Sequence, residues 1–517
     1  MSKTNFYVTS PIYYVNDNPH IGHAYTSISC DIIARFKRLQ GVNVFFLTGT
    51  DEHGQKVEKS ALKNNKTPQK FCDEVSQSFI ELAQNINLSN DDFIRTTEER
   101  HKNNVQTLWK ILEEGGFIYK DVYEGWYSVR DEAFYGQDEI IDGKAPSGAE
   151  VEWHKEESYF FKLSQFGDKL LEYYDQNPQF IEPKTRFNEV KSFVKSGLRD
   201  LSISRNSFSW GVKVPNDNNH VIYVWLDALT NYISALNYNK NEQKYQDFWL
   251  NSNESPIHIV GKDILRFHAV YWPAFLMAAN IKLPYKIFAH GWWTNQGQKI
   301  SKSVGNVIDP KQEIKWLENL GCDNDLAVDY FRYFLMREVP FGNDGDYSRE
   351  NFILRINAEL ANNIGNLAQR TLTMIFRNCE AKIPEVEDKI LKDYQKFCQN
   401  FDQKIPQLIE ELKFDKALEV IIEFANQINK DLNDQAPWNL KKEGKIKEMQ
   451  NILYIAADSV RRIAIWLQPF MPKSSITMLN FLNLSIDEMQ IDVLKILRTG
   501  HEIKQPKPVF LRLNNDI

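Results

Sequence analysis

Two short motifs, far apart in the chain, carry the residue types best suited to chemistry. Residues 19–23 read Pro-His-Ile-Gly-His, and residues 299–303 read Lys-Ile-Ser-Lys-Ser. The two histidines add hydrogen-bond donors at an expected helix start, where unpaired N–H groups and a partial positive charge attract phosphate. Lys299 and Lys302 lie on a loop flanked by glycines and can reach triphosphate oxygens as mobile charges. Together the motifs indicate a nucleotide site that closes around a triphosphate.

Each motif also has a simpler interpretation when it is taken alone. The first is equally consistent with a helix cap that carries two surface histidines. The second is, by itself, more typical of a solvated basic loop. Their joint occurrence favours the nucleotide site, and Gly22 adds to it because a missing side chain lets a flat base lie on the backbone.

The hydrophobic pattern predicts a scaffold that brings the motifs together. Residues 5–9 read as a strand, 21–39 as a helix and 42–47 as a buried strand, which is a βαβ unit. Parallel sheets bind ligands at the carboxyl ends of their strands, and both residues 20–23 and 48–54 lie at such ends. We therefore predict an α/β fold with a Rossmann-like parallel sheet.

The pattern changes twice further along the chain. Residues 116–219 are rich in glycine and aromatics, with short strands and turns, before the α/β pattern returns with 221–227, 257–263 and 286–290. A long segment then has helical period only. The predicted divisions are 1–115 (first half of the Rossmann-like domain), 116–219 (connective insertion domain), 220–290 (second half of the Rossmann-like domain), 291–345 (region of the second motif), 346–488 (all-α helical bundle) and 489–517 (tail packing on the body).

Composition excludes several classes of protein. The 517 residues are 42% hydrophobic, which predicts a globular chain with large cores. A net charge of -7 argues against generic coating of nucleic acid, although a local basic groove remains compatible with it. The five cysteines form no C-x-x-C pair, so neither a disulfide framework nor a cysteine zinc site is indicated. No leader pattern and no run of about 18 apolar residues is present, so we expect a cytoplasmic protein without a membrane span.

The motif pair resembles the two signatures of class I aminoacyl-tRNA synthetases, and the wider sequence resembles methionyl-tRNA synthetases. The narrower resemblance spans nearly the whole chain. It is carried, in order, by residues 14–23, 49–54 (Gly-Thr-Asp-Glu-His-Gly), 223–228 (Tyr-Val-Trp-Leu-Asp-Ala), 261–268 and 290–292 (His-Gly-Trp). It implies ATP-dependent activation of methionine to methionyl-adenylate and transfer to the 3′ end of tRNA(Met), with Mg²⁺ accompanying ATP.

The resemblance implies a methionine pocket. Asp51 matches the carboxylate that holds the substrate ammonium through a charge-assisted bond. Aromatic and aliphatic walls suit a polarizable thioether, and Tyr14 and His268 can offer weak polar contacts to its sulfur. For isolated aromatics such as Trp225, ordinary core is the alternative. The implied methionine-binding residues are Ile12, Tyr14, Asp51, Trp225, Ala228, Tyr232, Ile264 and His268.

The resemblance also implies the residues that hold ATP and act in the reaction. Lys302 is the strongest catalytic candidate, because a mobile loop lysine can engage selectively in the transition state. Asp263 is expected on the ribose. Arg205 matches a family arginine near the reacting groups, with a surface arginine as the alternative. The implied ATP-binding residues are His20, Gly22, His23, Lys262, Asp263, Lys299, Ser301 and Lys302, and the implied catalytic residues are His20, His23, Lys299, Lys302 and Arg205.

A polar stripe in the helical segment is the implied anticodon contact. Asn362, Asn366 and Arg370 recur four residues apart, and Trp438 is a second outlier. Amides and arginine can hydrogen-bond splayed bases, and an indole can stack on one. The matching family positions read the CAU anticodon. Without the resemblance, a helix face with a buried tryptophan would be the preferred interpretation.

The chain departs from the commoner family pattern in its insertion. Many relatives carry C-x-x-C zinc knuckles there, whereas this chain offers only His154, so we expect no structural zinc. We also expect a monomer, since no dimer-forming C-terminal module is recognised. Two alternatives stay open: a class I synthetase for another apolar amino acid, and a tRNA-binding paralogue without catalysis. The intact His20, His23, Asp51 and signature lysines argue against the second.

Overall fold

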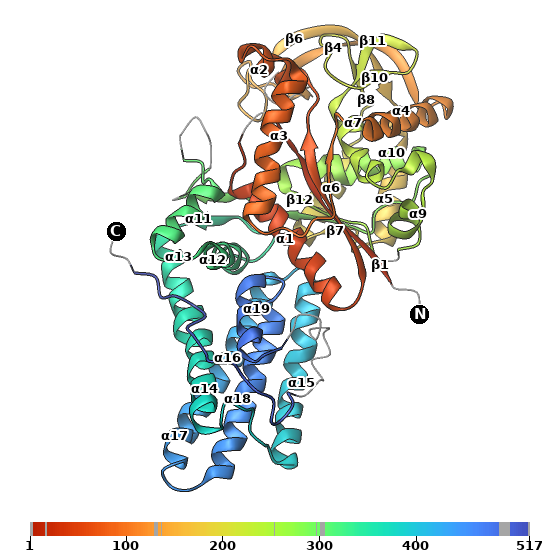
Figure 1. The fold of residues 1–517 in the computed structure, drawn as a ribbon. Helices are drawn as coiled ribbons and strands as arrows, with labels where there is room; N and C mark the ends of the chain where they lie inside the picture. The colour runs from red at the N-terminus through yellow and green to blue at the C-terminus, as the bar shows by residue number, and fades with distance from the viewer. Residues whose placement is uncertain are drawn as a thin grey trace.

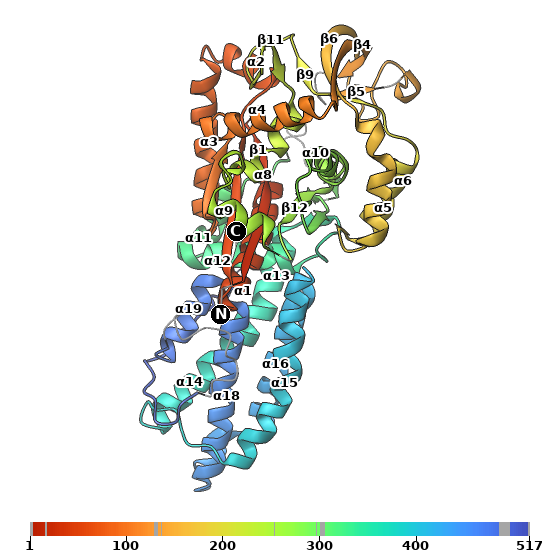
Figure 2. The same cartoon turned by 90° about the vertical axis from the view of Figure 1, so that its right-hand side faces the viewer.

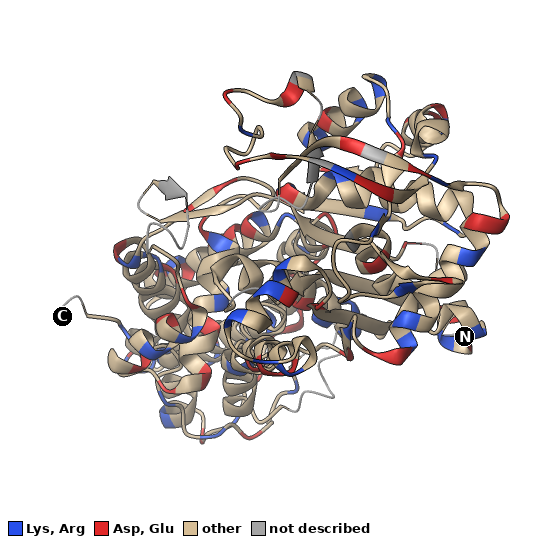
Figure 3. Ribbon diagram, turned by 90° about the horizontal axis from the view of Figure 1, so that it is seen from above, with Lys and Arg blue, Asp and Glu red and all other residues tan. Residues whose placement is uncertain are grey.

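The computed structural model describes residues 4–15, 18–128, 133–135, 137–252, 254–295, 297–299, 306–484 and 497–514. Figure 1 shows an α/β domain above a bundle of long helices. Basic and acidic residues are interspersed along the ribbon when the molecule is seen from above (Figure 3). In the ranges described, no helix is long and apolar enough to cross a membrane.

A six-stranded parallel sheet forms the centre of the α/β domain, in the order β3-β2-β1-β12-β13-β7. The chain moves outward from β1 on one side and from β12 on the other, so the order reverses between these two strands. Carboxyl ends of parallel strands leave a crevice at such a point. The expected Rossmann-like fold is confirmed. The strands are β1 (Asn5–Tyr14), β2 (Asn43–Asp51), β3 (Asp92–Arg95), β7 (Ile181–Glu182), β12 (Ile257–Gly261) and β13 (Lys286–His290).

Helices cover both faces of this sheet and bury a core against each. Neighbouring residues of β1, Tyr7 and Val8, belong to different cores, because side chains alternate across a strand. The core around Val8 includes α1, and the core around Tyr7 includes α4. The helices of this domain are α1 (Ile21–Leu39), α2 (Gln55–Lys63), α3 (Pro68–Asn85), α4 (Glu99–Glu114), α7 (Val224–Leu229), α8 (Asn231–Ser234), α9 (Gln243–Tyr245) and α10 (Trp272–Ala278), with π-helical turns at Gln246–Leu250 and Phe267–Tyr271.

The region predicted as one insertion, residues 116–219, is divided between sheets. It forms two small sheets of its own, but β7 pairs with β13 at the edge of the central sheet. The two helices that flank β7 lie on the outer side of the domain (Figure 2). A strand of two residues has no periodic signal, so the sequence could not reveal it. The insertion elements are β4 (Ile118–Ser128), β5 (Ala133–Tyr135), β6 (Glu152–Phe161), α5 (Gly167–Gln176), α6 (Lys184–Lys195), β8 (Leu201–Ser202), β9 (Ser204–Arg205), β10 (Lys213–Val214) and β11 (Asp217–Ile222).

Residues 221–227, expected to resume the parallel sheet, do not do so. β11 ends at Ile222 and runs antiparallel to β9, and α7 begins at Val224. A short apolar run does not distinguish a buried strand from a buried helix. Trp225 therefore lies on a helix that begins just after a strand end, although that strand belongs to a small antiparallel sheet.

A small sheet and a helical bundle complete the chain. The sheet contains β14 (Trp293–Asn295), β15 (Gln298–Lys299) and β16 (Gly345–Tyr347). The tail residue Phe510 is buried, and the Tyr330 hydroxyl donates to the Leu511 carbonyl at 2.8 Å. The remaining helices are α11 (Pro310–Asn319), α12 (Asn324–Arg337), α13 (Arg349–Arg355), the π-helix Ile356–Gly365, α14 (Asn366–Asn378), α15 (Asp388–Glu410), α16 (Phe414–Gln435), α17 (Pro437–Leu440), α18 (Ile446–Leu467) and α19 (Pro472–Phe481).

One fully buried arginine joins the sheet domain to the bundle. Arg332 on α12 places Nη2 2.7 Å from Asp31 Oδ2 on α1. It also donates to the carbonyls of Pro469 and Phe470, which lie between α18 and α19. Burial opposes ionisation of Asp31, but Arg35 and Arg332 outweigh it and lower its pKa to about 2. The pair therefore stays charged and links three segments distant in sequence.

We predict that Asp31→Ala destabilises the protein strongly. Removing one partner of a buried ion pair leaves the other uncompensated, which costs about 3–5 kcal/mol. Thermal and urea unfolding measure the loss. Asp325→Ala is the control, because Asp325 pairs with Lys473 at 3.3 Å between α12 and α19 but both side chains are exposed. Its loss should not exceed about 1 kcal/mol, and equal losses in the two variants would contradict the role of Arg332.

Candidate active site

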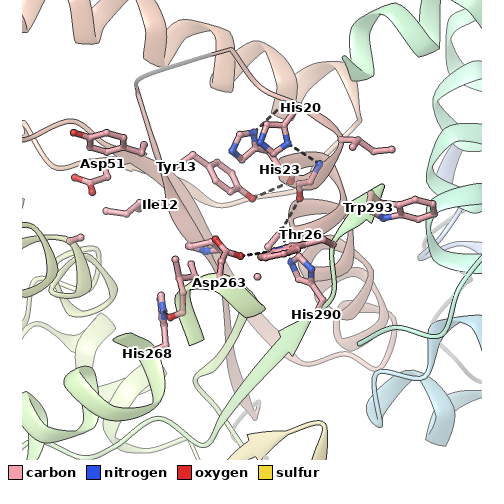
Figure 4. Close-up of a pocket in the computed structure, with 18 of the residues that line it drawn as sticks. Ile12, Tyr13, His20, His23, Thr26, Asp51, Asp263, His268, His290 and Trp293 are labelled. Carbon is pink, nitrogen blue, oxygen red and sulfur yellow. Dashed lines mark hydrogen bonds between the residues drawn. The ribbon is translucent and has the colours of Figure 1, made fainter. Parts of the chain in front are cut away.

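A cavity of about 790 Å³ opens at the carboxyl ends of β1, β2, β12 and β13. Figure 4 shows Asp51 and Ile12 on one side of it and His20, His23 and His290 on the other. The structure brings together every residue implied for methionine and part of the set implied for ATP. These lining residues are Ile12, Tyr14, Asp51, Trp225, Ala228, Tyr232, Ile264 and His268, together with His20, Gly22, His23 and Asp263.

Two histidines build the cap of α1 at this cavity. His20 Nδ1 accepts from the Gly22 N–H, and His23 Nδ1 accepts from the His20 N–H, each at 3.1 Å. The two rings stack with centroids 3.8 Å apart. Burial lowers the pKa of both imidazoles, and that of His23 falls well below its usual range. Since Nδ1 is an acceptor in each neutral ring, the hydrogen lies on Nε2 and two uncharged donors result.

The first backbone N–H groups of α1 are already paired, so the sequence expectation of unpaired donors was wrong. Ile21 donates to the Ile308 carbonyl at 2.9 Å, beyond the second motif. Gly22 donates to the His20 ring. His23 donates to the His20 carbonyl at 2.9 Å. An anion here would meet the helix dipole and the imidazole Nε2–H groups rather than free backbone donors.

Gly22 is required by the position of the His20 ring. A Cβ at residue 22 would lie 2.9 Å from His20 Cε1, closer than side chains approach one another. The glycine therefore makes room for the folded imidazole, in addition to lining the cavity.

Both ends of the second motif's segment reach the cavity. The Lys299 backbone pairs with Thr294 in the β14–β15 hairpin, and Thr294 lines the cavity. After the segment, Val307 lines the cavity as well. Ser301 and Lys302 lie outside the described residues, as does the side chain of Lys299.

The part of the cavity around Asp51 combines one carboxylate with apolar walls. Asp51, which is 7% exposed, ends β2 and faces Tyr14 across the register of β1 and β2. Trp225 stacks on Phe267 with centroids 3.5 Å apart, and Ala228 lies further along α7. This arrangement fits a small zwitterion with an apolar side chain.

His268 has no free nitrogen for a substrate, contrary to expectation. Its Nδ1 donates to the Ile264 carbonyl at 2.9 Å, and its Nε2 accepts from the Tyr232 hydroxyl at 2.6 Å. Burial lowers its pKa to about 4, so the ring is neutral at physiological pH. His268 therefore orients Tyr232 and forms part of the wall.

Lys262 and Asp263 occupy different positions relative to the cavity. Asp263 lines it and accepts from Trp292 Nε1 at 3.1 Å. Lys262 is not among the described lining residues. Its Nζ lies 2.6 Å from both oxygens of Asp344 and 4.2 Å from the centre of the Trp292 ring.

Arg205 is neither exposed nor on the described cavity wall. It is buried on β9, where Nη1 donates to the Ser202 hydroxyl and the Ser204 carbonyl at 2.6 Å each. Its guanidinium lies 3.7 Å from the centre of the Tyr223 ring. Because Tyr223 caps α7, Arg205 supports the helix that carries Trp225.

Several wall residues escaped sequence reasoning. His290 lines the cavity, and its Nε2 lies 2.7 Å from Thr26 Oγ1 one turn into α1. The Tyr13 hydroxyl lies 2.6 Å from Ser27 Oγ. The rule that ligands bind at strand ends would have identified His290, which ends β13. Thr26 and Tyr13 carry no such signal.

The polar stripe of the bundle forms one surface with Trp438. Asn362 and Asn366 are exposed, and Arg370 Nη2 donates to Asn433 Oδ1 at 2.9 Å. The Arg370 guanidinium lies 5.2 Å from the centre of the Trp438 ring. Trp438 is 39% exposed, so the alternative of a buried tryptophan was wrong.

Comparison with known proteins gives consistent matches over the whole chain. A family of class I tRNA synthetases (M) matches residues 6–152 and 144–372, and the anticodon binding domain of methionyl tRNA ligase matches residues 380–517. The methionine–tRNA ligase of Rickettsia felis is 54% identical, with 100% of both chains covered. That of Brucella suis biovar 1 is 48% identical over 99% of this chain and 98% of its own. The structure of Mycobacterium tuberculosis methionyl-tRNA synthetase in complex with methionyl-adenylate matches with a TM-score of 0.92 and 42% identity, covering 98% of this chain and 99% of that one.

We predict that His268 titrates near pH 4 in the folded protein rather than near its ordinary value. Between the two pKa values the unfolded chain binds more protons than the folded protein. The contribution of the neutral His268 to the free energy of unfolding is therefore complete above the ordinary pKa and is lost as pH falls to about 4. It amounts to roughly 3 kcal/mol. Proton NMR of the ring C–H, assigned with His268→Gln, measures the midpoint. A midpoint near 6.5 would contradict the described environment.

Proposed function

Because the chain belongs to the class I methionyl-tRNA synthetases, we propose that it activates methionine with ATP and transfers the methionyl group to the 3′ end of tRNA(Met). The observation that carries the proposal is the single cavity that joins a carboxylate and apolar walls to a histidine-capped helix. The comparisons give no support to a synthetase for another amino acid or to a non-catalytic paralogue.

Methionine would bind at the Asp51 end of the cavity. A carboxylate suits the substrate ammonium, since a charge-assisted hydrogen bond is stronger than a neutral one. Trp225 and Ala228 of α7 and the aliphatic side chain of Ile12 supply walls for the thioether. Tyr232 also lines the cavity, and its hydroxyl is held by His268 Nε2.

ATP would bind at the α1 end of the cavity. The neutral His20 and His23 can each donate one hydrogen bond from Nε2 to phosphate oxygens, and Asp263 lies where it can accept from a ribose hydroxyl. The two motif lysines would supply the positive charge. Lys302 is three residues from Lys299 along the chain, and the Lys299 backbone belongs to the hairpin beside the cavity.

The reaction needs no protein nucleophile. The methionine carboxylate attacks the α-phosphorus, and pyrophosphate leaves. The chain contributes positioning and charge stabilisation. We assign Lys302 to the transition state, Lys299, Ser301 and Lys262 to ATP, and Arg205 to support of α7.

Magnesium would enter with ATP, held by phosphate oxygens and water. Within the ranges described, no three His, Cys, Asp or Glu side chains gather as metal ligands. The expected lack of zinc remains a prediction. We also propose a monomer located in the cytoplasm.

The tRNA anticodon would bind at the exposed surface formed by Asn362, Asn366, Arg370 and Trp438. The Arg370 guanidinium is oriented by Asn433 and faces the indole, so both can engage one splayed base. This surface lies in the bundle, away from the cavity (Figure 1). We therefore place the chemical reaction and the recognition of the tRNA anticodon in separate domains.

We predict that Asp51→Asn lowers kcat/KM for methionine by about 10- to 100-fold, the value of one hydrogen bond to a charged group. The measurement is methionine-dependent ATP–pyrophosphate exchange. Asp73→Asn is the control, because Asp73 is a half-exposed carboxylate that pairs with Arg95 outside the described cavity wall. A higher exchange rate with leucine or cysteine than with methionine would overturn the proposed substrate.

We predict that Trp438→Ala weakens tRNA charging and spares exchange, which requires no tRNA. Loss of one base stack is worth about 1–3 kcal/mol, so kcat/KM for tRNA should fall about 5- to 150-fold. Phe376→Ala is the control, an aromatic of similar exposure on α14. Equal damage to exchange and charging by Trp438→Ala would instead indicate a structural tryptophan.

A further inference from the structure

A buried carboxylate lies between two histidines behind one wall of the cavity. Asp227 on α7 is 1% exposed. Its Oδ2 lies 2.7 Å from His53 Nδ1, and its Oδ1 lies 2.8 Å from His101 Nε2. All three side chains are buried, and none is among the described residues that line the cavity. The function proposed above gives this cluster no role.

The positions of these residues in the chain connect the cluster to the amino-acid end of the cavity. His53 follows Asp51 closely at the end of β2. Asp227 lies between Trp225 and Ala228 on α7, which contribute the opposite wall. The second histidine belongs to α4, which packs against α7. The cluster therefore fastens the carboxylate-bearing strand end, the wall helix and a third helix to one another.

The hydrogen bonds of the cluster are charge-assisted. Burial opposes ionisation of Asp227, but the adjacent His53 and His101 outweigh it and lower its pKa to about 2. Each oxygen accepts one imidazole N–H, and such bonds strengthen away from water. His101 Nδ1 is buried and has no hydrogen-bond partner among the described residues, so Asp227 alone fixes that ring through a hydrogen bond.

Helix α4 is itself held firmly and can serve as the fixed support. Asn104 Oδ1 accepts from the Asn239 N–H at 2.8 Å, which ties α4 to the segment after α8. Gln106 Nε2 donates to the Lys213 carbonyl at 3.1 Å on β10. Displacement of α7 relative to α4 would therefore have to break the bonds to Asp227.

We propose that Asp227 is a positioning residue of the methionine site, which sets the distance between the α7 wall and the strand end that carries Asp51. The inference rests on the proposed function of the cavity. Its consequence is selective, because α7 contributes Trp225, Ala228 and Leu229 to the wall that we assign to methionine, whereas the described cavity residues that we assign to ATP lie at α1 and after β12. Loss of Asp227 should therefore affect methionine and leave ATP nearly unaffected.

The test is steady-state ATP–pyrophosphate exchange with the full chain carrying Asp227→Asn. KM for methionine should rise about tenfold or more, because misplacement of a binding wall is costly, while kcat and KM for ATP change less than about twofold. Equilibrium dialysis with methionine alone should show the same fold-change. A purely structural role would lower the thermal midpoint without separating the two KM values.

Asp458→Asn is the matched control. Asp458 is buried to a similar degree and binds two cations, Arg461 and Arg462, but it lies in α18 of the bundle. It should lower the thermal midpoint and leave both KM values unchanged. A rise in KM for methionine in this variant would overturn the inference, because the effect would then follow from any buried carboxylate.

His101→Gln is the second variant. If Asp227→Asn folds poorly, the same selective rise in KM for methionine is measured in His101→Gln. Because His101 acts through Asp227, the double variant should be no worse than the single Asp227 variant. An unchanged KM for methionine in these variants, or equal rises for methionine and ATP, would overturn the inference. If Asp51→Asn raises KM for methionine while these variants do not, the inference alone fails. If Asp51→Asn also leaves it unchanged, the proposed function fails with it.

Discussion

The reversal of strand order between β1 and β12 is the constraint on which the rest of the site depends. The chain goes from β1 to β2 and β3 on one side of this point, and from β12 to β13 on the other side. The crevice between them receives Asp51 from one side and Asp263 and His290 from the other. The topology therefore determines which residues distant in sequence meet in this cavity.

Charge is distributed unevenly within that cavity. The α1 end offers neutral imidazoles, since burial holds the pKa of His20 and His23 below the usual range. Its first backbone donors are used internally by the cap and by Ile308. The described wall also includes the cation Lys56, and the lysines of the second motif are the further cations that we propose for the triphosphate.

The sequence predicted the strongly periodic elements and the strand-end residues well. The helix at 21–39 and the strand at 286–290 match α1 and β13, because long amphipathic or buried runs carry a clear signal. It failed where tertiary pairing decides, because β7 is too short to show a period and the strand pattern at 221–227 ends at Ile222 in another sheet. The occupied nitrogens of His268 depend on partners that are distant in sequence or set by the local fold, so no spacing rule could reveal them.

The contacts of Arg332 mean that the two domains, although separate in sequence, depend on each other for stability. Arg332 lies before the bundle, Asp31 lies in the first helix, and two of its carbonyl acceptors lie between α18 and α19. A fragment that stopped short of the bundle would keep the guanidinium and lose those acceptors. The catalytic part therefore relies on the far end of the polypeptide to complete its own interior. The hydrogen bonds of this buried guanidinium are therefore complete only when the segment between α18 and α19 is in place.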